Sequence, residues 1–438
     1  MYDIVEGLMI FFIIFLLLIF IRLSIRKFLP WKILSISSFN LAGILLFIAL
    51  GMGDKSINTP SLVRITIVIV FYIFLLLGEI ASKSIKYSFD RFGKLGDYIL
   101  HRSGLRYILN LVFVYFILSS IINVFSLGRS ISEIINIDWK YNTLVERSEN
   151  FVRYAYSQKL IGIKALAKMI IGQMKGFWYL SIGTIAYHKP LLTYLFLIIY
   201  SFNIFLLSAG GTRSGFAIGI MVPILLFLFS TKYKKLGIII LLITSIGIIL
   251  LLNITLLGRQ GLAISTNFFE SISRVLYTDF AYGGKALELA TIAKQPTLEK
   301  GINYFIHLIG VLVPRVLWPS KFIIDPNWEM TEAYTGSTLY RGGTIFLFTP
   351  LGEALFYFGY IGLIIVSFLY GFTTTFLERI YSTSKCYWGL LAEVYIWSFL
   401  GMRHTYYNLF TTLVVGRLVV IILIILLTSM LKSKKQQC

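Results

Sequence analysis

The chain has 438 residues, of which 57% are hydrophobic and only 14% are charged. Soluble domains carry about 25% charged residues, so this composition excludes an ordinary soluble fold, a disordered or collagen-like chain and a small disulfide-stapled secreted domain. Forty Lys and Arg against 20 Asp and Glu give a formal net charge of +20. In a chain this apolar, that excess favours basic loops sorted across a bilayer over nucleic-acid binding, so no nucleic-acid partner is expected.

Eleven apolar segments predict an all-α polytopic membrane protein with about 11 transmembrane helices, because a helix needs about 20 apolar residues to cross a bilayer. In chain order the segments are 7–25, 33–53, 62–82, 105–127, 169–187, 190–208, 214–231, 236–257, 349–373, 388–403 and 407–431. More polar stretches lie at 128–168 and 258–348. We therefore expect an N-terminal transmembrane bundle over 1–257, a large loop over 258–348, and a C-terminal bundle over 349–438.

Basic residues give the expected orientation of this bundle. They cluster at 26–32, 83–102, 232–235, 379–385 and 432–435. All five clusters fall on one side of the membrane if the N-terminus lies outside and there are eleven spans. The positive-inside rule identifies that side as the cytoplasm, which predicts an outer N-terminus and a cytoplasmic C-terminus.

The large outer loop is too apolar and too long to be a simple connector. Residues 268–293 predict an amphipathic helix with a break at Gly283 and Gly284, and residues 301–312 predict a short apolar helix. Asp325, Pro326 and Asn327 have the pattern of a helix start. A structured loop of about 90 residues is usually functional.

Arginines on the predicted outer side are not explained by the sorting of charge across the membrane. Five of them follow the sixth span or lie in the large loop: Arg213, Arg259, Arg274, Arg315 and Arg341. Arg403 and Arg417 lie in or near the last two spans. The planar guanidinium fork suits phosphate oxygens, and glycines beside three of the five let backbone N–H groups approach an anion. Any single arginine can equally end a loop or face solvent, but the set predicts a phosphate-bearing ligand.

Three residues are candidates for the general base of a reaction. Glu353 lies at the predicted outer start of the ninth span, where a carboxylate is costly unless it is paired with an arginine or has a catalytic role. His307 in the outer loop and His404 at the end of the tenth span can act near neutral pH, or can be structural histidines. Glu79 and Glu393 are further intramembrane carboxylates to which the sequence assigns no role. No nucleotide-binding or metalloprotease motif occurs, and Cys386 and Cys438 have no metal-type spacing, so no cofactor or metal is expected.

Two motifs of the outer loop and the ninth span carry a resemblance to a known family. Residues 313–321 read VPRVLWPSK, Arg341 begins RGGT, and residues 350–362 read PLGEALFYFGYIG. In this pattern, and in the small-residue turn around Arg213, the chain resembles the Wzy-type oligosaccharide repeat-unit polymerases, which make O-antigen and capsular polysaccharide in bacteria. Ten residues separate Arg341 from Gly352, as in the Arg-x10-Gly pattern of some polymerases.

The resemblance implies a metal-independent membrane glycosyltransferase with GT-C-type architecture in the bacterial inner (cytoplasmic) membrane. It would transfer a growing glycan from undecaprenyl pyrophosphate to the non-reducing end of a new lipid-linked repeat unit. The five outer arginines would bind the pyrophosphate, and Glu353, His404 or His307 would act as the base. A chain-length regulator and a flippase are possible partners.

Two other functions stay open at this stage. An O-antigen ligase would perform the same chemistry with a lipid or protein acceptor, although His307 lacks the sequence context of the ligase histidine. A transporter or flippase of a lipid-linked saccharide would usually show repeated halves and short loops, whereas this sequence shows no repeated halves and has a loop of about 90 residues.

Overall fold

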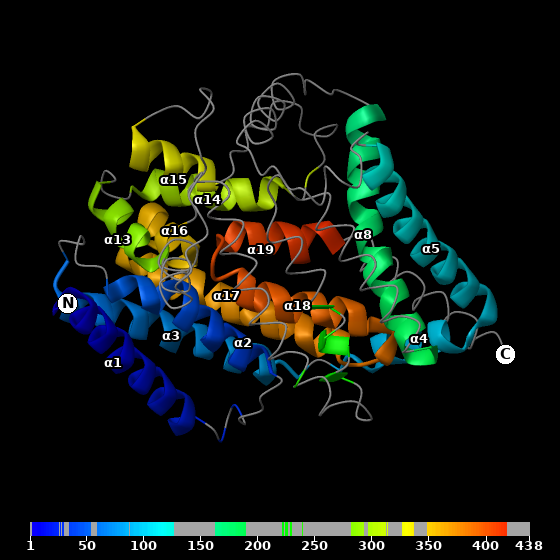
Figure 1. Ribbon diagram of the computed structural model, residues 1–438, viewed down its shortest axis with the longest axis horizontal. Coiled ribbons are helices and arrows are strands. Elements are labelled where there is room, and N and C mark those ends of the chain that lie inside the picture. Colours follow the sequence, from blue (N-terminus) through cyan, green and yellow to red (C-terminus); the bar gives the residue numbers. More distant parts are fainter. Residues whose placement is uncertain are drawn as a thin grey trace, which may run out of the picture. The chain divides into compact units, whose positions relative to one another are not determined.

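The computed structural model describes residues 2–25, 27, 29, 35–53, 59–86, 88–126, 163–189, 221–222, 224–226, 228–229, 239, 282–292, 297–311, 313, 326–336 and 348–417. Within these ranges every regular element is helical (Figure 1). Two helices, α3 (Ser61–Ser84) and α17 (Tyr360–Tyr381), are long and apolar enough to cross a membrane by length and composition. The all-α class expected from the sequence is therefore present. The number of eleven spans stays a prediction, because several apolar segments fall outside the described residues.

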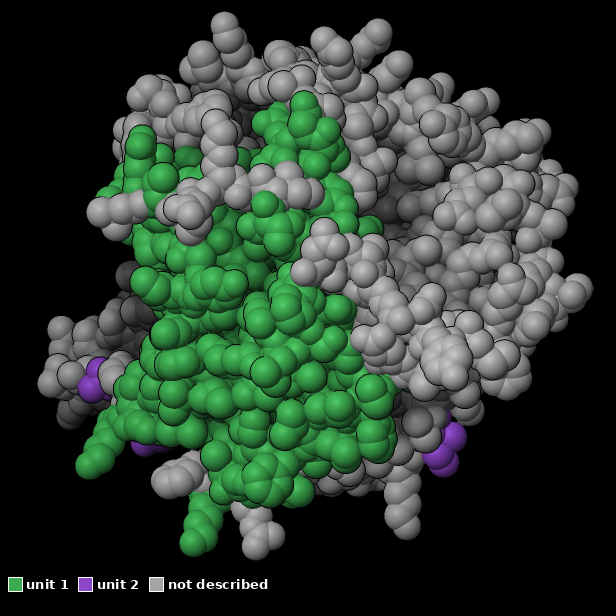
Figure 2. Space-filling view, turned by 90° about the vertical axis from the view of Figure 1, so that its left-hand side faces the viewer, with its two compact units in different colours: residues 1–87, 276–378, 394–415 green, residues 88–275, 379–393, 416–438 purple. Residues whose placement is uncertain are grey.

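The chain divides into two compact units, which Figure 2 distinguishes by colour. The first unit comprises residues 1–87, 276–378 and 394–415. The second comprises residues 88–275, 379–393 and 416–438. Each unit is built from stretches that are distant in sequence, so residues near both ends of the chain contribute to the same core.

The N-terminal part of the first unit consists of three apolar helical segments. Helix α1 (Tyr2–Ser24) is followed by α2 (Ile36–Gly43), which continues as the π-helix η1 (Ile44–Ala49) and the 3-10 helix η2 (Leu50–Gly53). Helix α1 packs on η1, η2 and α3. These segments correspond to the apolar stretches expected at 7–25, 33–53 and 62–82.

Helices α3 and α17 approach each other closely through small residues. A Cβ on Gly78 of α3 would meet the carbonyl oxygen of Phe368, and a Cβ on Gly371 of α17 would meet that of Leu75. Glycines that let two backbones come this close are typical of helix interfaces within membranes, where packing replaces the hydrophobic effect as the driving force. Two long apolar helices of the first unit are thus in direct backbone contact.

The described part of the loop expected at 258–348 forms three short helices within the first unit. They are α13 (Tyr282–Ile292), α14 (Leu298–Gly310) and α15 (Pro326–Thr335), and all three contact α16 (Thr349–Phe358). The expected helices near 301–312 and after Asp325 are therefore present. Gly283 and Gly284 do not interrupt α13 but lie in its first turn, where a Cβ on Gly283 would meet the carbonyl oxygen of Ile48. Close packing, rather than a helix break, explains the glycine at position 283.

The ninth predicted span is two helices instead of one. The chain turns at Gly359, whose φ of 61° and ψ of −147° are available essentially only to glycine. Helix α16 ends there, and α17 begins at Tyr360 and continues to Tyr381. Because residues 349–358 are all apolar or small except Glu353 and two hydroxyl side chains, the sequence pattern did not show the break. Glu353 consequently lies on the short buried helix α16 and not on the long apolar helix.

Two further helices lie in the C-terminal part of the described chain. Helix α18 (Trp388–Leu400) ends in a tight turn, in which the N–H groups of Arg403 and His404 donate to the carbonyl oxygens of Leu400 and Gly401. Helix α19 (Tyr406–Leu413) follows and packs on α14 and α16 (Figure 1).

The second unit is built around a pair of long helices. Helix α5 (Ser103–Ser126) packs along α8 (Ile163–His188), with the rings of Phe113 and Trp178 stacked at 5.1 Å between centroids (Figure 1). Helix α4 (Asp90–His101) and the 3-10 helix η6 (Lys385–Tyr387) complete this core. Helix α4 lies in a stretch that the sequence identified only as a basic loop.

Candidate functional site

The residues expected to carry chemistry divide into two groups. Glu353, His404 and His307 are described by the structure and all belong to the first unit. The five arginines expected to bind pyrophosphate lie outside the described residues: Arg213, Arg259, Arg274, Arg315 and Arg341. Their role stays a prediction.

Glu353 is completely buried, with 0% of its surface exposed. Its carboxylate accepts hydrogen bonds from the backbone N–H groups of Tyr406 at 2.5 Å and Tyr407 at 3.1 Å. These two groups belong to the first turn of α19, where N–H groups have no partner inside the helix and carry partial positive charge. The sequence suggested that Glu353 either pairs with an arginine or acts in catalysis. The structure shows a third role, in which the Glu353 carboxylate holds the start of α19.

The same helix start is capped a second time by a side chain of its own. The Oγ1 atom of Thr405 accepts a hydrogen bond from the N–H of Asn408 at 3.3 Å. Two separate acceptors therefore fix the chain where the turn after α18 enters α19. That turn carries Arg403 and His404, so Glu353 determines where these two side chains lie.

Tyrosines from three helices surround the Glu353 carboxylate. The ring of Tyr304 on α14 lies 4.9 Å from that of Tyr357 on α16, and Tyr304 is only 1% exposed. Burial raises the pKa of the Tyr304 hydroxyl well above its usual value, and the nearby Glu353 carboxylate and Tyr406 add to the effect. Tyr304 is thus a neutral hydroxyl beside a buried carboxylate. The sequence did not single it out, because it is one of 27 tyrosines.

A charged pair lies next to these tyrosines. The hydroxyl of Tyr357 donates to Oε2 of Glu329 on α15 at 2.6 Å. Glu329 also acts electrostatically on Lys300, whose Nζ lies 3.6 Å from the centre of the Phe356 ring. Burial lowers the pKa of the Lys300 amine, and the Glu329 carboxylate acts in the opposite direction. The sequence did not single out either residue, because acidic and basic residues are nearly balanced over positions 258–348.

We call this set the α14–α16–α19 junction. Contacts or electrostatic interactions connect Lys300, Tyr304, Glu329, Glu353, Tyr357 and Tyr406, and we include His307 on α14 and His404 in the turn before α19. The set combines two carboxylates, an amine, two imidazoles and three phenols on an aromatic framework. Glu353, Tyr304, Tyr357 and Tyr406 are at most 2% exposed, so this part of the set forms a packed core.

The two histidines of the junction differ in their environment. The ring of His404 lies 5.7 Å from that of Trp397, and burial together with the Arg403 guanidinium lowers the pKa of His404 to about 3. It is therefore neutral at physiological pH and a weak base. His307 is half-buried on α14, three residues after Tyr304 and hence on the same face, and its ring makes no hydrogen bond to a described residue. His404 is half-buried as well, so the two imidazoles differ in their neighbours, with Arg403 beside His404, and not in accessibility.

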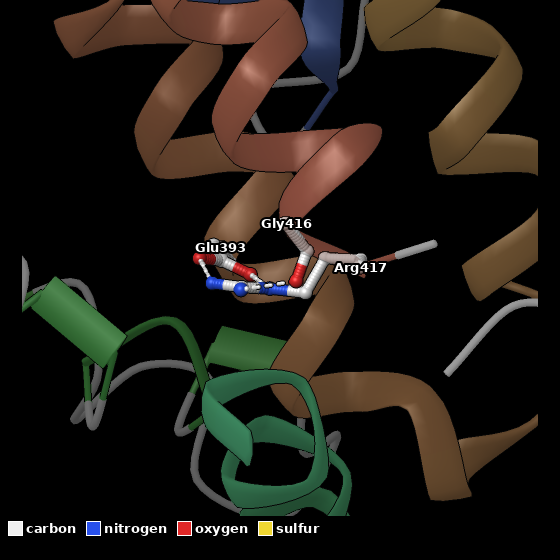
Figure 3. Close-up of polar contacts among 3 residues, drawn as sticks. All are labelled: Glu393, Gly416 and Arg417. Carbon is white, nitrogen blue, oxygen red and sulfur yellow. Dashed lines mark hydrogen bonds and ion pairs between the residues drawn. The ribbon is translucent and has the colours of Figure 1, made fainter. Parts of the chain in front are cut away.

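A second buried arrangement lies in the second unit and explains one of the unassigned arginines. Nε of Arg417 donates to Oε2 of Glu393 at 2.7 Å, and Nη2 donates to Oε1, so the guanidinium binds the carboxylate with both arms (Figure 3). The remaining Nη1 donates to the carbonyl oxygen of Gly416 at 2.9 Å. Both side chains are nearly fully buried, at 4% and 2% exposed. Arg417 therefore neutralises the Glu393 carboxylate, and its fork is occupied.

No group of three or more His, Cys, Asp or Glu side chains that could hold a metal ion occurs in the part of the chain that the structure describes. Compared with known proteins, the sequence matches no protein-family model and no curated protein, and the structure matches no solved structure.

Proposed function

We propose that this protein polymerises lipid-linked oligosaccharide repeat units into a surface polysaccharide. It would transfer the growing glycan from undecaprenyl pyrophosphate to the non-reducing end of a new lipid-linked unit. The observation that carries the proposal is the α14–α16–α19 junction, in which helices of the large predicted outer loop surround a buried carboxylate with tyrosines and imidazoles. This junction includes the Glu353 motif on which the resemblance to the polymerases rests.

The reaction needs three things of the protein. A hydroxyl oxygen of the acceptor sugar forms a bond to the anomeric carbon of the growing glycan, while the bond from that carbon to the pyrophosphate oxygen breaks. The electron pair leaves with the pyrophosphate, whose developing charge has to be stabilised, and the hydroxyl proton has to go to a base. The sugar–pyrophosphate bond is already activated, so no other energy source is needed.

We assign the proton to His307 and a positioning role to Glu353. His307 and His404 are both half-buried, and the Arg403 guanidinium weakens His404 as a base. Glu353 is fully buried and holds the two N–H groups that begin α19. Its effect on the reaction would come through the turn that carries His404. The low pKa of His404, about 3, favours a neutral hydrogen-bonding role over that of a base.

The leaving pyrophosphate is assigned to the five outer arginines. Fixed cationic forks stabilise charge that appears only in the transition state, and loss of one such donor typically costs about 100-fold to 1,000-fold in rate. Arg213→Ala, Arg315→Ala and Arg341→Ala should leave membrane insertion intact but shorten or abolish the polymer. Arg102→Ala, at an exposed position beside Tyr98 in the second unit, is the matched control. Normal long glycan ladders from all three variants would rule out the pyrophosphate site.

The base is tested with His307→Gln in a membrane preparation that elongates lipid-linked repeat units. General bases contribute about 100-fold to 10,000-fold to a rate, so the variant should elongate at less than about 1% of the wild-type rate. His101→Gln on the exposed face of α4 is the control and should keep the wild-type rate. If His307→Gln also keeps it, His307 is not the base.

The same glycan ladders separate the polymerase from a ligase. A cell that lacks a polymerase still attaches single repeat units to the final acceptor, whereas a cell that lacks a ligase attaches none. Single units in the deletion strain support the proposal, and their absence supports the ligase.

A further inference from the structure

A cluster of buried polar side chains lies inside the first unit, away from the α14–α16–α19 junction. Ser37 and Asn40 come from α2, Tyr72 and Glu79 from α3, and Thr374 from α17. All five are at most 3% exposed. Because all five side chains are buried, bulk water does not solvate them.

Glu79 is the charged member of the cluster, and half of its carboxylate is unmatched. Oε1 accepts a hydrogen bond from Nδ2 of Asn40 at 2.8 Å. Oε2 has no hydrogen-bond partner, and the carboxylate forms no ion pair, among the described residues. Arg22 and Lys83 act on it only through longer-range electrostatics, and Nη1 of Arg22 donates to the carbonyl oxygen of Leu29 at 2.5 Å. Burying a carboxylate that has one oxygen without a hydrogen-bond partner lowers the free energy of unfolding.

Two neutral oxygen atoms beside Glu79 are unmatched as well. Oδ1 of Asn40 and Oγ of Ser37 have no partner at hydrogen-bonding distance in the described part of the chain, and the Ser37 hydroxyl is close enough to the Glu79 carboxylate to interact with it. Ser37 and Asn40 are three residues apart and therefore share one face of α2. The Asn40 amide nitrogen also lies 3.5 Å from Oγ1 of Thr374, so this amide is held between α3 and α17. A carboxylate oxygen, an amide oxygen and a hydroxyl oxygen thus lack partners within one buried cluster.

We propose that Glu79, Asn40 and Ser37 bind a dehydrated monovalent cation, for which Na⁺ is the probe. Oxygen atoms are the ligands that hard cations prefer, and a single cation would satisfy all three unmatched atoms while neutralising the carboxylate. The set has only one negative charge and Arg22 nearby, which disfavours a divalent ion that needs several carboxylates. The site joins α2 to α3 and α17.

This inference does not depend on the proposed function, because the cluster shares no residue with the α14–α16–α19 junction. It is tested on the purified full chain in detergent by thermal unfolding in increasing NaCl, with choline chloride keeping the ionic strength constant. The melting temperature should rise with Na⁺ and then saturate. At a Na⁺ concentration of ten times the dissociation constant, binding favours the folded state about 11-fold.

Two variants and one control connect the effect to the site. Glu79→Gln, which keeps the size of the side chain and removes its charge, should abolish the Na⁺ response. Ser37→Ala removes one ligand and should raise the Na⁺ concentration at half-effect several-fold. Glu378→Gln is the matched control, since that carboxylate accepts hydrogen bonds from the Tyr395 hydroxyl at 2.6 Å and the Ile36 N–H at 3.4 Å. It should respond to Na⁺ as the wild type does.

Three results would overturn the proposal. Equal melting temperatures in NaCl and choline chloride would mean that water fills the cluster. A melting temperature that depends on pH but not on Na⁺ would assign a proton to Glu79 in place of the cation. A full Na⁺ response in Glu79→Gln would place the cation elsewhere. If Glu79→Gln does not fold, the wild type and Ser37→Ala still decide between these outcomes.

Discussion

Replacement of Glu353 by glutamine tests whether this residue holds the start of α19. The substitution keeps the size of the side chain but removes its charge and replaces one acceptor oxygen by an NH₂ donor. Of the two N–H groups at 2.5 and 3.1 Å, only one can keep an acceptor. The other faces a donor in a fully buried site.

The magnitude follows from the groups that lose their partner. A hydrogen bond to a charged group contributes about 1.5–3 kcal/mol, and the favourable interaction of an anion with a helix N-terminus contributes about 0.3–1 kcal/mol. We therefore expect Glu353→Gln to lower the free energy of unfolding by about 2–4 kcal/mol. Glu353→Ala leaves both N–H groups without an acceptor and should lower the free energy of unfolding further.

The assay is denaturant unfolding of the purified protein in detergent, together with the elongation rate of the folded fraction. Glu299→Gln, an exposed carboxylate in the first turn of α14, is the control and should change stability by less than about 0.5 kcal/mol. If Glu353→Gln were as stable as this control, the carboxylate would not be holding α19. If it were destabilised but its folded fraction elongated at the wild-type rate, the positioning role in catalysis would be refuted.

Two further predictions concern buried charge. Arg417→Met or Glu393→Leu alone should lower the free energy of unfolding by about 3–5 kcal/mol, because each leaves a buried charge unpaired. In a double-mutant cycle, the double variant should recover most of this loss. Additive losses from the two single variants would contradict a direct ion pair. His404 has a pKa of about 3 when folded against about 6.5 when unfolded, so below pH 6.5 the unfolded state binds a proton that the folded state does not. The free energy of unfolding should therefore fall as the pH drops from 6.5 towards 3, by about 2 kcal/mol at pH 5. His404→Gln should remove this part of the pH dependence. If His404→Gln shows the same pH dependence of stability as the wild type, His404 is not the group responsible.

The sequence alone predicted the helices of this protein well where hydrophobicity was continuous. The apolar stretches that include α1, α2, α3, α5 and α8 were predicted as helices because an apolar run of about 20 residues is too long for a buried strand. The short helices α14 and α15 were visible through their apolar run and their Pro start. The split between α16 and α17 was not, since it depends on the backbone angles of a single glycine within an apolar run.

The candidate site shows the same division. The sequence identified Glu353, His307 and His404 because charged and titratable residues are rare in such an apolar chain. It did not give the partners of Glu353, which are backbone N–H groups more than 50 residues away. It also missed Tyr304, Lys300 and Glu329, which differ from other tyrosines and charges only in what they contact.

Composition and hydrophobic periodicity are local properties, so the sequence by itself determined the all-α class, the positions of the apolar helices and the few polar residues worth examining. Whether a buried charge is paired depends on which helices meet, and that is a property of the tertiary structure. The structure decided that Arg417 neutralises Glu393, that Glu353 holds a helix start, and that Glu79 keeps an unmatched oxygen among the described residues. The physical reason is that a charge in an apolar interior is stable only through its contacts, and those contacts come from residues distant in the sequence.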